Sequence, residues 1–458
     1  MILLMTTAQP SNSPWGTANR ELPLGLAYIG AVLEKEGFEV EIFDNYLLNK
    51  SIDAIKLEIK RLAPEIVGIT CSSNTYQRCV ETAKAVKEVL PSCKVVVGGP
   101  HPSIMPESML QHPEIDYVVL GEGELAIVEL ATGITNGKDD AAFAQISSIA
   151  YRHNGKIVKT TQKFIDDLDE IPFPARHLMP MHLYDRKIKF LNVSPVDYVN
   201  VIRGCPYNCT WCNVKELWGK TCRAFGPRRV VEELDHLVNN FGTKGIYFIG
   251  DNFTINKKRT IEICKMMKKY KLDLEWVCDT GVDLISRELL KEMKAAGCQT
   301  IWFGVESGSP YILEKINRNI SLQQAIHAFK LCKEEEIQTA VSFMLGIPGE
   351  TAKDMKATFK FARKLDPDWC QFNIFIAYPG CDLYQEILQK GLYDRLEDFL
   401  AYVKTEDFNF ESLLKIQRQF HKNFNKSPKR VLRKIRREGI LRVLGNSVKL
   451  LQSSRSTH

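Results

Sequence analysis

Three cysteines stand close together in the segment Arg203-Gly204-Cys205-Pro206-Tyr207-Asn208-Cys209-Thr210-Trp211-Cys212-Asn213. Their spacing is CxxxCxxC, directly after an apolar run that is typical of a β-strand. Three thiolates hold a cuboidal iron–sulfur cluster and leave one iron without a protein ligand, so that a substrate or cofactor can bind there. The alternative is a structural zinc site, which needs a fourth ligand such as Cys222.

The cysteine segment opens a series of strand-then-helix units. We expect strands near residues 198–202, 245–249, 274–278, 300–305, 340–345 and 371–376. Six parallel units suit a complete or partial barrel of the TIM type, whose active site lies at the carboxyl ends of the strands. The cysteines stand at such an end, which favours an iron–sulfur cluster over a structural zinc ion.

The first 140 residues also alternate short apolar runs with helical patterns. The expected strands are residues 1–5, 38–43, 66–71, 94–97 and 117–120. Each needs a crossover to reach the next, which predicts a parallel, doubly wound sheet. Ligands bind beyond the carboxyl ends of such strands, and these ends are glycine-rich or polar here.

The sequence therefore predicts an α/β protein of four parts. Residues 1–140 form a doubly wound, Rossmann-like domain, and residues 141–194, which include Ile171-Pro172-Phe173-Pro174, form a linker. Residues 195–390 form a partial (β/α)6 TIM-type barrel. Residues 391–458 are expected to be a small helical region that ends in a basic tail.

The charge of the chain is concentrated at its C-terminus. The net charge is +6, but residues 426–458 hold ten basic side chains and one acid, Glu438; subtracting the tail's +9 leaves about −3. The body is therefore not a basic nucleic-acid surface. The tail is expected either to pack on the barrel as a solvated helix or to contact an anionic membrane surface, with RNA as a weaker alternative.

Nothing in the sequence indicates a membrane span or a secretory signal. No run approaches the roughly 18 apolar residues of a span, and the opening Met-Ile-Leu-Leu-Met lacks a basic leader. The thirteen cysteines are odd in number and scattered, which argues against a disulfide framework. These features predict a cytoplasmic protein, and the ten cysteines outside the cluster segment are expected to be structural.

The cysteine motif, the barrel pattern and the preceding doubly wound domain resemble the radical S-adenosylmethionine (SAM) superfamily, specifically its cobalamin-binding branch, over about residues 1–390. The resemblance implies that the catalytic, metal-binding residues are Cys205, Cys209 and Cys212. It also implies that SAM is bound by Trp211, Gly250, Asp251, Glu306, Gly346 and Pro348. Asp251 has an alternative role as the cap of a helix that begins near Ile255. Where relatives commonly have Thr-Arg-Val-Asp, this chain has Thr280-Gly281-Val282-Asp283, so any role of that arginine is missing or moved.

The first domain resembles a B12-binding domain in its loops. The residues that the resemblance assigns to cobalamin are Thr70, Ser72, Ser73, Gly98, Gly99, His101, Gly121, Glu122 and Gly123. The chain has no Asp-x-His-x-x-Gly segment, so we expect cobalamin to be bound without a histidine ligand from that motif. His101 is the one candidate near the sheet edge, and a loop histidine hydrogen-bonded to its neighbours is the favoured interpretation.

The resemblance implies methylation of an unactivated carbon, with a 4Fe–4S cluster, SAM and methylcobalamin as cofactors. It also implies a flavodoxin- or ferredoxin-type electron donor and a small-molecule substrate, for which the tail would suit a lipid or tetrapyrrole. Radical cyclisation or oxidation without methyl transfer, as in tetrapyrrole ring-forming relatives, is one alternative. A cobalamin sensor without catalysis is another. A methylthiotransferase is disfavoured because Cys71, Cys79 and Cys93 lack the spacing of a second cluster motif.

Overall fold

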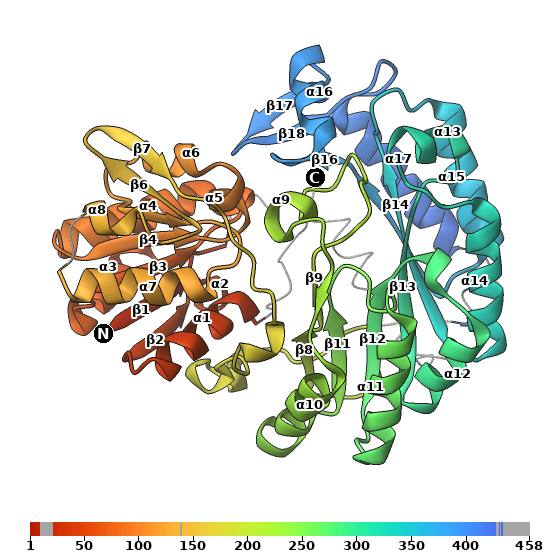
Figure 1. Ribbon diagram of the computed structural model, residues 1–458. Coiled ribbons are helices and arrows are strands. Elements are labelled where there is room, and N and C mark those ends of the chain that lie inside the picture. The colour runs from red at the N-terminus through yellow and green to blue at the C-terminus, as the bar shows by residue number, and fades with distance from the viewer. Residues whose placement is uncertain (10–21, 138–139, 427–429, 431, 434–458) are drawn as a thin grey trace.

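A computed structural model describes residues 1–9, 22–137, 140–426, 430 and 432–433 of the chain (Figure 1). Two α/β units lie side by side. The N-terminal unit is coloured red to yellow, and the C-terminal unit green to blue. This arrangement confirms the predicted order of a doubly wound domain followed by a second series of parallel strands.

The N-terminal unit is built on one seven-stranded sheet of order β2-β1-β3-β4-β5-β6-β7. The pairs from β2 to β5 are parallel, as predicted. The strands are β1 (Ile2–Thr6), β2 (Val40–Asp44), β3 (Ile66–Thr70), β4 (Lys94–Gly98), β5 (Tyr117–Val119), β6 (Ile149–His153) and β7 (Lys156–Lys159).

Helices cover both faces of this sheet, which explains why its central strands are apolar throughout. Leu3 and Met5 of β1 pack into one hydrophobic cluster, whereas Ile2 and Leu4 pack into the other, as the period of two requires. The helices are α1 (Leu24–Lys35), α2 (Asn45–Leu48), α3 (Ile52–Leu62), α4 (Tyr76–Val89), α5 (Pro100–Ile104), α6 (Pro106–Leu110), α7 (Glu124–Thr135) and α8 (Asp140–Phe143).

The prediction that residues 141–194 form a linker is wrong for its first part. β6 pairs antiparallel with β5, and β7 pairs antiparallel with β6, so the sheet gains a hairpin at its edge. Residues 160–195 contain no strand or α-helix and lead to the second unit. They are fixed by buried contacts, including the Tyr184 hydroxyl, which donates to Asp44 Oδ2 at 2.6 Å.

The C-terminal unit is an open, six-stranded parallel sheet of order β15-β14-β13-β12-β11-β8, which agrees with a partial barrel. All six strands lie where the sequence predicts them. They are β8 (Val196–Asn200), β11 (Gly245–Ile249), β12 (Glu275–Thr280), β13 (Cys298–Glu306), β14 (Gln338–Leu345) and β15 (Trp369–Ile374).

Helices cover the outside of this sheet, and a short antiparallel pair of strands, between which the cysteine loop and α9 lie, follows β8. The paired strands are β9 (Ile202–Arg203) and β10 (Arg223–Ala224), and the helices are α9 (Val214–Trp218), α10 (Pro227–Phe241), α11 (Lys257–Lys269), α12 (Arg287–Ala295), α13 (Pro310–Lys315), α14 (Leu322–Glu334) and α15 (Ala352–Leu365). Cys264, Cys298 and Cys332 are buried in the core, which is the structural role expected of them.

The prediction of a helical region after residue 390 is incomplete. Helix α16 (Asp382–Lys390) is followed by β17 (Tyr393–Glu397) and β18 (Leu400–Val403), which join β16 (Ile376–Ala377) in a small antiparallel sheet. Helix α17 (Phe410–Asn425) then packs against β15. The side chains of Phe420 and Phe424 contact the ring of Phe372, so α17 covers the free edge of the parallel sheet.

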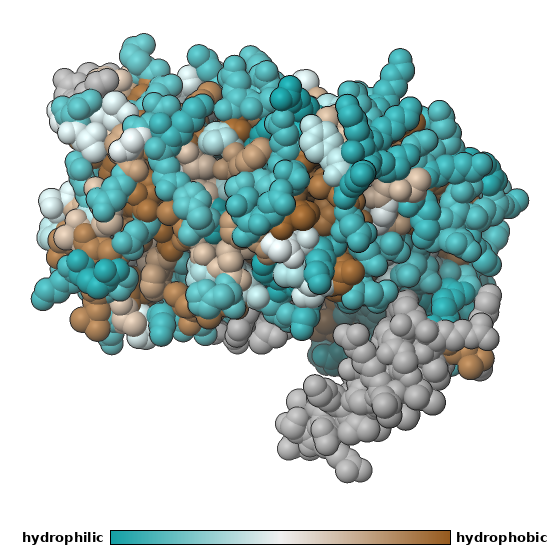
Figure 2. Space-filling view, turned by 90° about the horizontal axis from the view of Figure 1, so that it is seen from below, coloured by the Kyte–Doolittle hydropathy of each residue, from teal (hydrophilic) through white to brown (hydrophobic). Residues whose placement is uncertain are grey.

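The described start of the basic tail is attached to the barrel. Arg430 and Arg433 form ion pairs with Asp366 at 3.0 and 2.6 Å. Residues 434–458 lie outside the described residues. Figure 2 shows hydrophilic side chains spread over the face seen from below, interrupted by smaller apolar areas. Within the described ranges, no helix has the length and apolar character needed to cross the bilayer.

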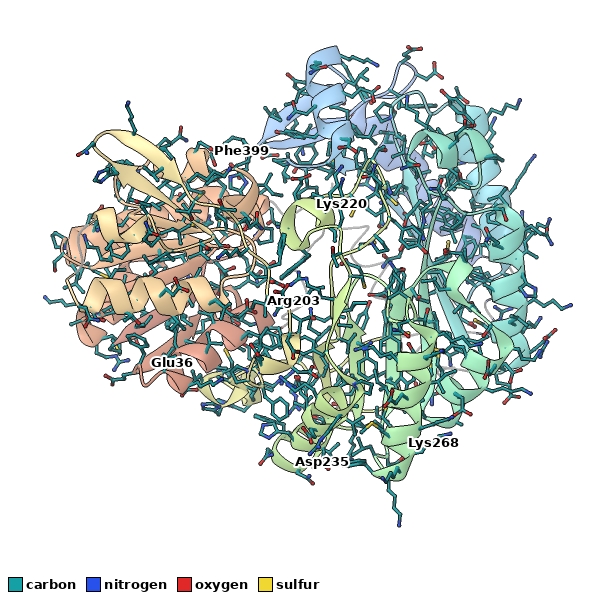
Figure 3. The ribbon with its side chains drawn as sticks, in the orientation of Figure 1. Glu36, Arg203, Lys220, Asp235, Lys268 and Phe399 are labelled. Carbon is teal, nitrogen blue, oxygen red and sulfur yellow. The ribbon has the colours of Figure 1, made fainter. Side chains whose placement is uncertain are left out.

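The hairpin β17–β18 contacts the N-terminal unit through its turn. Phe399 stacks edge-on against Tyr76 with ring centroids 5.1 Å apart, and it also contacts the ring of His101 at 5.0 Å. Figure 3 shows Phe399 at this junction of the two units. Phe399 has a φ of +66°, an unfavourable conformation for a bulky residue, which these ring contacts help to stabilise.

We expect Phe399→Ala to loosen this junction because both ring contacts are lost. Aromatic contacts contribute about 0.5–1.5 kcal/mol beyond buried area, so amide hydrogen exchange in residues 73–104 should be about three- to tenfold faster. Leu396→Ala is the matched control, since Leu396 lies on the same hairpin and is 48% exposed. Equal exchange in the two variants would contradict this role of Phe399.

Candidate active site

The three motif cysteines line a cavity of about 700 Å³ at the carboxyl end of the parallel sheet. The loop that carries them is attached to the barrel by backbone hydrogen bonds. The Thr210 N–H donates to the Ile316 carbonyl at 3.1 Å, and the Leu383 N–H donates to the Thr210 carbonyl at 3.0 Å. The sequence therefore places three soft ligands on one fixed loop.

The surroundings of the thiols suit a bound cluster. Burial raises the pKa of all three, that of Cys212 to about 12, so the free thiols are protonated and cluster binding releases protons. The Asn252 amide donates to Cys205 Sγ at 3.6 Å. Such hydrogen bonds to a ligand sulfur tune the potential of an iron–sulfur cluster.

The zinc alternative receives no support from the position of Cys222. That residue does not line the cavity of the three cysteines. Among the described residues, no three His, Cys, Asp or Glu side chains lie close enough together to hold a single metal ion.

Buried carboxylates line the same cavity near the cysteines. Asp251 follows β11 and Glu306 ends β13, and burial raises their pKa values to about 6 and about 7. The helix-cap alternative for Asp251 is wrong, because the cap of α11 is Asn256, whose side chain accepts from the Arg259 N–H at 3.1 Å. Asp251 lines the cavity, and its carboxylate also accepts from the backbone N–H of Gly204.

Glu306 has the features of a ligand-binding residue. Its φ is +73° and it is only 6% exposed, and the charge of Arg318 favours its ionised form against the effect of burial. Strained, buried carboxylates are typical of functional sites. The amino and hydroxyl groups of SAM are donors that suit Glu306 and Asp251, so this part of the cavity fits that cofactor.

Arg318 and Asp279 are charged side chains that also line the cavity and were not predicted from the sequence. Arg318 lies beside Cys209 and donates to the Gly304 carbonyl at 2.8 Å. Asp279 accepts from the Tyr247 hydroxyl at 2.9 Å, and burial raises its pKa to about 7. No motif marks either residue.

Arg318 is a candidate to replace the arginine that relatives commonly have at the position of Gly281. Asp283 accepts instead from the Tyr207 hydroxyl at 2.7 Å, while Arg318 lies over the Tyr207 ring, 5.8 Å from its centroid. The cavity thus contains one guanidinium, supplied by the segment after α13 rather than by the segment after β12.

The other residues predicted for SAM differ in position. Trp211 lines the cavity, but Gly250, Gly346 and Pro348 do not. Gly250 has a φ of +148°, and a Cβ there would lie 2.4 Å from Ile202 Cγ2, so this glycine is needed for close packing. A role of Gly346 and Pro348 near adenine stays a prediction.

A second cavity, of about 330 Å³, lies between the two units. The predicted cobalamin residues in its lining are Thr70, Gly98, Gly99, Gly121, Glu122 and Gly123. The barrel contributes Asn200, Arg203, Leu217, Trp218 and Ile249. Glycines line one side of the cavity, where they let the backbone approach a ligand closely, and the Trp218 side chain lines the other side. Such a lining suits a flat, bulky ligand.

Ser72, Ser73 and His101 lie outside this lining. Both ring nitrogens of His101 are hydrogen-bonded, Nδ1 to the Ser73 hydroxyl at 3.0 Å and Nε2 to the Ser108 hydroxyl at 2.9 Å. Burial lowers the pKa of His101 to about 4. The prediction of a hydrogen-bonded histidine is confirmed, although it stands in α5 rather than in a loop, and the structure does not support His101 as a cobalamin ligand.

Helix α9 connects the two cavities. Its first residues, Val214 and Lys215, line the cysteine cavity, and its last residues, Leu217 and Trp218, line the second cavity. Ile249, the last residue of β11, lines the second cavity, and Asp251, two residues later, lines the cysteine cavity. The two sites are thus neighbours that share one wall.

We expect Cys209→Ala to lose cluster binding, because two thiolates cannot hold a cubane that normally takes three or four protein ligands. After anaerobic reconstitution with iron and sulfide, the variant should bind less than about one quarter of the iron of the unmodified chain. Cys222→Ala is the matched control and should keep its full iron content. Iron loss in Cys222→Ala to the same extent would revive a four-cysteine metal site.

We expect His101→Ala to leave the cobalt coordination of bound cobalamin unchanged, because both ring nitrogens already bond to serines. The electron paramagnetic resonance spectrum of cob(II)alamin reports nitrogen bound at the axial position. Identical nitrogen splitting in the variant and the unmodified chain is the expected result. A splitting that disappears with His101 would show that this histidine is a ligand.

The comparisons with known proteins agree with this geometry. The family model of the Radical SAM superfamily matches residues 199–362, and that of the B12 binding domain matches residues 17–131. A protein of Pyrococcus horikoshii named an uncharacterized methyltransferase is 36% identical over 420 residues, which are 90% of each chain. An anaerobic magnesium-protoporphyrin IX monomethyl ester cyclase of Rubrivivax gelatinosus is 31% identical over 375 residues, covering 80% of this chain and 66% of the cyclase.

The fold has a close counterpart among solved structures. TsrM of Kitasatospora setae, a radical S-adenosylmethionine methyltransferase solved with cobalamin and a 4Fe–4S cluster, has a TM-score of 0.69 at 20% identity, over 86% of this chain and 76% of that one. The two matched domains imply a 4Fe–4S cluster and SAM in the barrel and cobalamin in the N-terminal unit. The chain is therefore an enzyme that belongs to the B12-binding branch of the radical SAM superfamily.

Proposed function

We propose that this enzyme transfers a methyl group to an unactivated carbon of a small molecule. The observation that carries the proposal is the shared wall at α9, with the cysteine cavity on one side and the cavity of the B12-binding domain on the other. When bound, the cluster and SAM supply a 5′-deoxyadenosyl radical that removes hydrogen, and methylcobalamin supplies the methyl group. A substrate carbon beside α9 lies within reach of both.

The residues of the cavity are proposed to hold SAM and exclude water. Asp251 accepts from the ammonium group, Glu306 accepts from hydroxyl groups, and Arg318 pairs with the carboxylate. This assignment gives the ammonium and carboxylate groups of SAM a partner of opposite charge and gives its hydroxyl groups an acceptor. Burial of these side chains strengthens the pairing, because the attraction between charges is weakly screened in a site without water.

The substrate is proposed to bind above Trp211 and beside Phe375, Ile376 and Tyr378, which line the same cavity. This part of the lining is apolar apart from the Tyr378 hydroxyl and the Trp211 indole N–H, which has no hydrogen-bond partner among the described residues. The nearby cation, Lys215, is already paired with Asp382 at 2.7 Å. A predominantly apolar substrate suits these side chains, and lipids and tetrapyrroles belong to that class.

The remaining parts of the functional hypothesis concern the cellular setting. A flavodoxin- or ferredoxin-type protein is proposed as the electron donor. A reducing, cytoplasmic compartment is proposed because all thirteen cysteines are free. Contact of the tail with an anionic membrane stays a hypothesis for residues 434–458. At the described start of the tail, Arg430 and Arg433 already pair with the barrel.

Label transfer from SAM tests methylation directly. The reconstituted chain is incubated anaerobically with cobalamin, a reductant, SAM with a deuterated methyl group, and a small-molecule extract of cells that make the protein. We expect 5′-deoxyadenosine and S-adenosylhomocysteine in about equal amounts, because one SAM gives the radical and a second gives the methyl group. A component of the extract should gain the labelled methyl.

The control is Cys209→Ala, which should form neither product from SAM. Continued formation of 5′-deoxyadenosine without label transfer, with cobalamin bound, would contradict methylation. That result would favour cyclisation or oxidation, the alternative to which the 31% identical cyclase points. Absence of both products from the unmodified chain would favour the non-catalytic alternative.

A further inference from the structure

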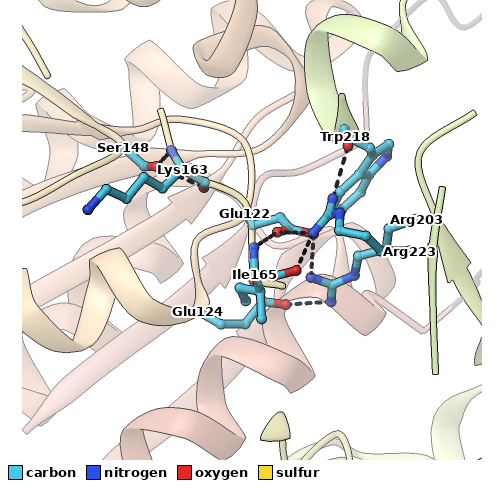
Figure 4. Close-up of polar contacts among 8 residues, drawn as sticks. All are labelled: Glu122, Glu124, Ser148, Lys163, Ile165, Arg203, Trp218 and Arg223. Carbon is cyan, nitrogen blue, oxygen red and sulfur yellow. Dashed lines mark hydrogen bonds and ion pairs between the residues drawn. The ribbon is translucent and has the colours of Figure 1, made fainter. Parts of the chain in front are cut away.

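Four charged side chains meet in the interior where the two units join. Arg203 donates to Glu122 at 3.1 Å and to Glu124 at 2.5 Å, and Arg223 donates to Glu122 at 2.7 Å (Figure 4). The side chains of Arg203 and both glutamates are at most 7% exposed. Two positive and two negative charges thus neutralise one another in a buried network.

The network is attached to the cluster loop through the backbone. Arg203 ends β9 and stands two residues before Cys205. Between them, Gly204 has a φ of +85°, and a Cβ there would lie 2.3 Å from the Thr221 carbonyl oxygen. The chain has little freedom at this point, so the position of Arg203 constrains where the first cluster ligand lies.

The other end of the network is the loop that lines the second cavity. Glu122 and Glu124 alternate with Gly121 and Gly123, and Gly121 to Glu124 all belong to that lining. Glu122 also accepts from the Ile165 N–H at 2.6 Å, so both of its oxygens are engaged by protein groups. Its carboxylate therefore joins the two units, and the role of Glu122 as a cofactor contact stays a prediction.

Aromatic rings further restrict Arg203. Its guanidinium lies 5.5 Å from the ring centroid of Tyr28 in α1 and 5.2 Å from that of Trp218 in α9. Figure 3 shows Arg203 between the two units. The planar guanidinium of Arg203 donates one hydrogen bond to each of two carboxylates and lies between two rings. Lysine cannot reproduce this geometry, because its ammonium group is not planar.

We propose that Arg203 is a positioning residue that couples the two cofactor sites, so that a cluster on the cysteine loop tightens the binding of cobalamin to the Gly121–Glu124 loop. The chemical basis is that the guanidinium holds both loops in one arrangement. By linkage, cobalamin strengthens cluster binding by the same factor. This inference rests on the cofactors of the family and is independent of whether a methyl group is transferred.

The test compares the dissociation constant of hydroxocobalamin for the full chain with and without its cluster. Binding is followed by visible absorption under anaerobic conditions in the absence of SAM. We expect the cluster to tighten binding about tenfold in the unmodified chain, within the usual range of coupling between sites. In Arg203→Gln the ratio of the two dissociation constants should fall to about one, and in Arg203→Lys the same ratio should stay below about three.

Arg229→Gln is the matched control. Arg229 is also a buried arginine, donating to Glu233 at 3.0 Å and to the Ile171 carbonyl at 3.2 Å, but it contacts neither cofactor loop. Loss of Arg229 should lower the free energy of unfolding and leave the ratio of the two dissociation constants unchanged. Retention of the full ratio in Arg203→Gln, or a ratio of one in the unmodified chain, would overturn the proposal.

A milder variant keeps the test decisive if Arg203→Gln does not fold. Glu124→Gln retains the shape of the side chain and removes one charge from the network. It should lower the ratio at least threefold. An unchanged ratio in folded Glu124→Gln would also overturn the proposal. Because no SAM is present, neither outcome depends on methyl transfer.

Discussion

The buried pairing of Arg203 with Glu122 and Glu124 is the interaction on which the relation between the two α/β units depends. A buried ion pair contributes little net stability, but loss of one partner leaves an uncompensated charge and costs about 3–5 kcal/mol. Such a pair fixes the position and orientation of its two partners relative to each other. Here it joins the loop of one cavity to the residue that precedes the first cluster cysteine, and Phe399 holds the same two units together from the hairpin side.

Much of the fold follows from local sequence patterns. The central strands of the N-terminal sheet are apolar runs, because helices cover both of its faces, and all six barrel strands were predicted. The edge hairpin β6–β7 was missed although Asn154-Gly155, with φ values of +51° and +73°, is a typical hairpin turn. The hairpin β17–β18 had no comparable signal: its turn is Asp398-Phe399, and its strands are stabilised by contacts with distant elements.

The residues of the site divide in a similar way. Some are marked by a local sequence pattern, and others reach the site only through the tertiary fold. The cysteine spacing and the acidic strand ends are local, so Cys205, Cys209, Cys212, Asp251 and Glu306 could be predicted, and all five line one cavity. Arg318 and Asp279 enter that cavity because the sheet curves, which no short motif records. Glu122 lies in a predicted loop and His101 lies in α5, and partners that no local motif records occupy their polar atoms: Ser73, Ser108, Arg203 and Arg223.

We propose that two cofactors lie on either side of α9, one held by the cysteine loop and the other by the loops of the N-terminal sheet. The most direct measurement is an anaerobic crystal structure of the chain reconstituted with iron, sulfide and cobalamin. We expect a cubane cluster on Cys205, Cys209 and Cys212, and a corrin ring between Gly98–Gly99 and Trp218. A corrin ring outside that cavity, or a metal ion that recruits Cys222, would contradict this proposal.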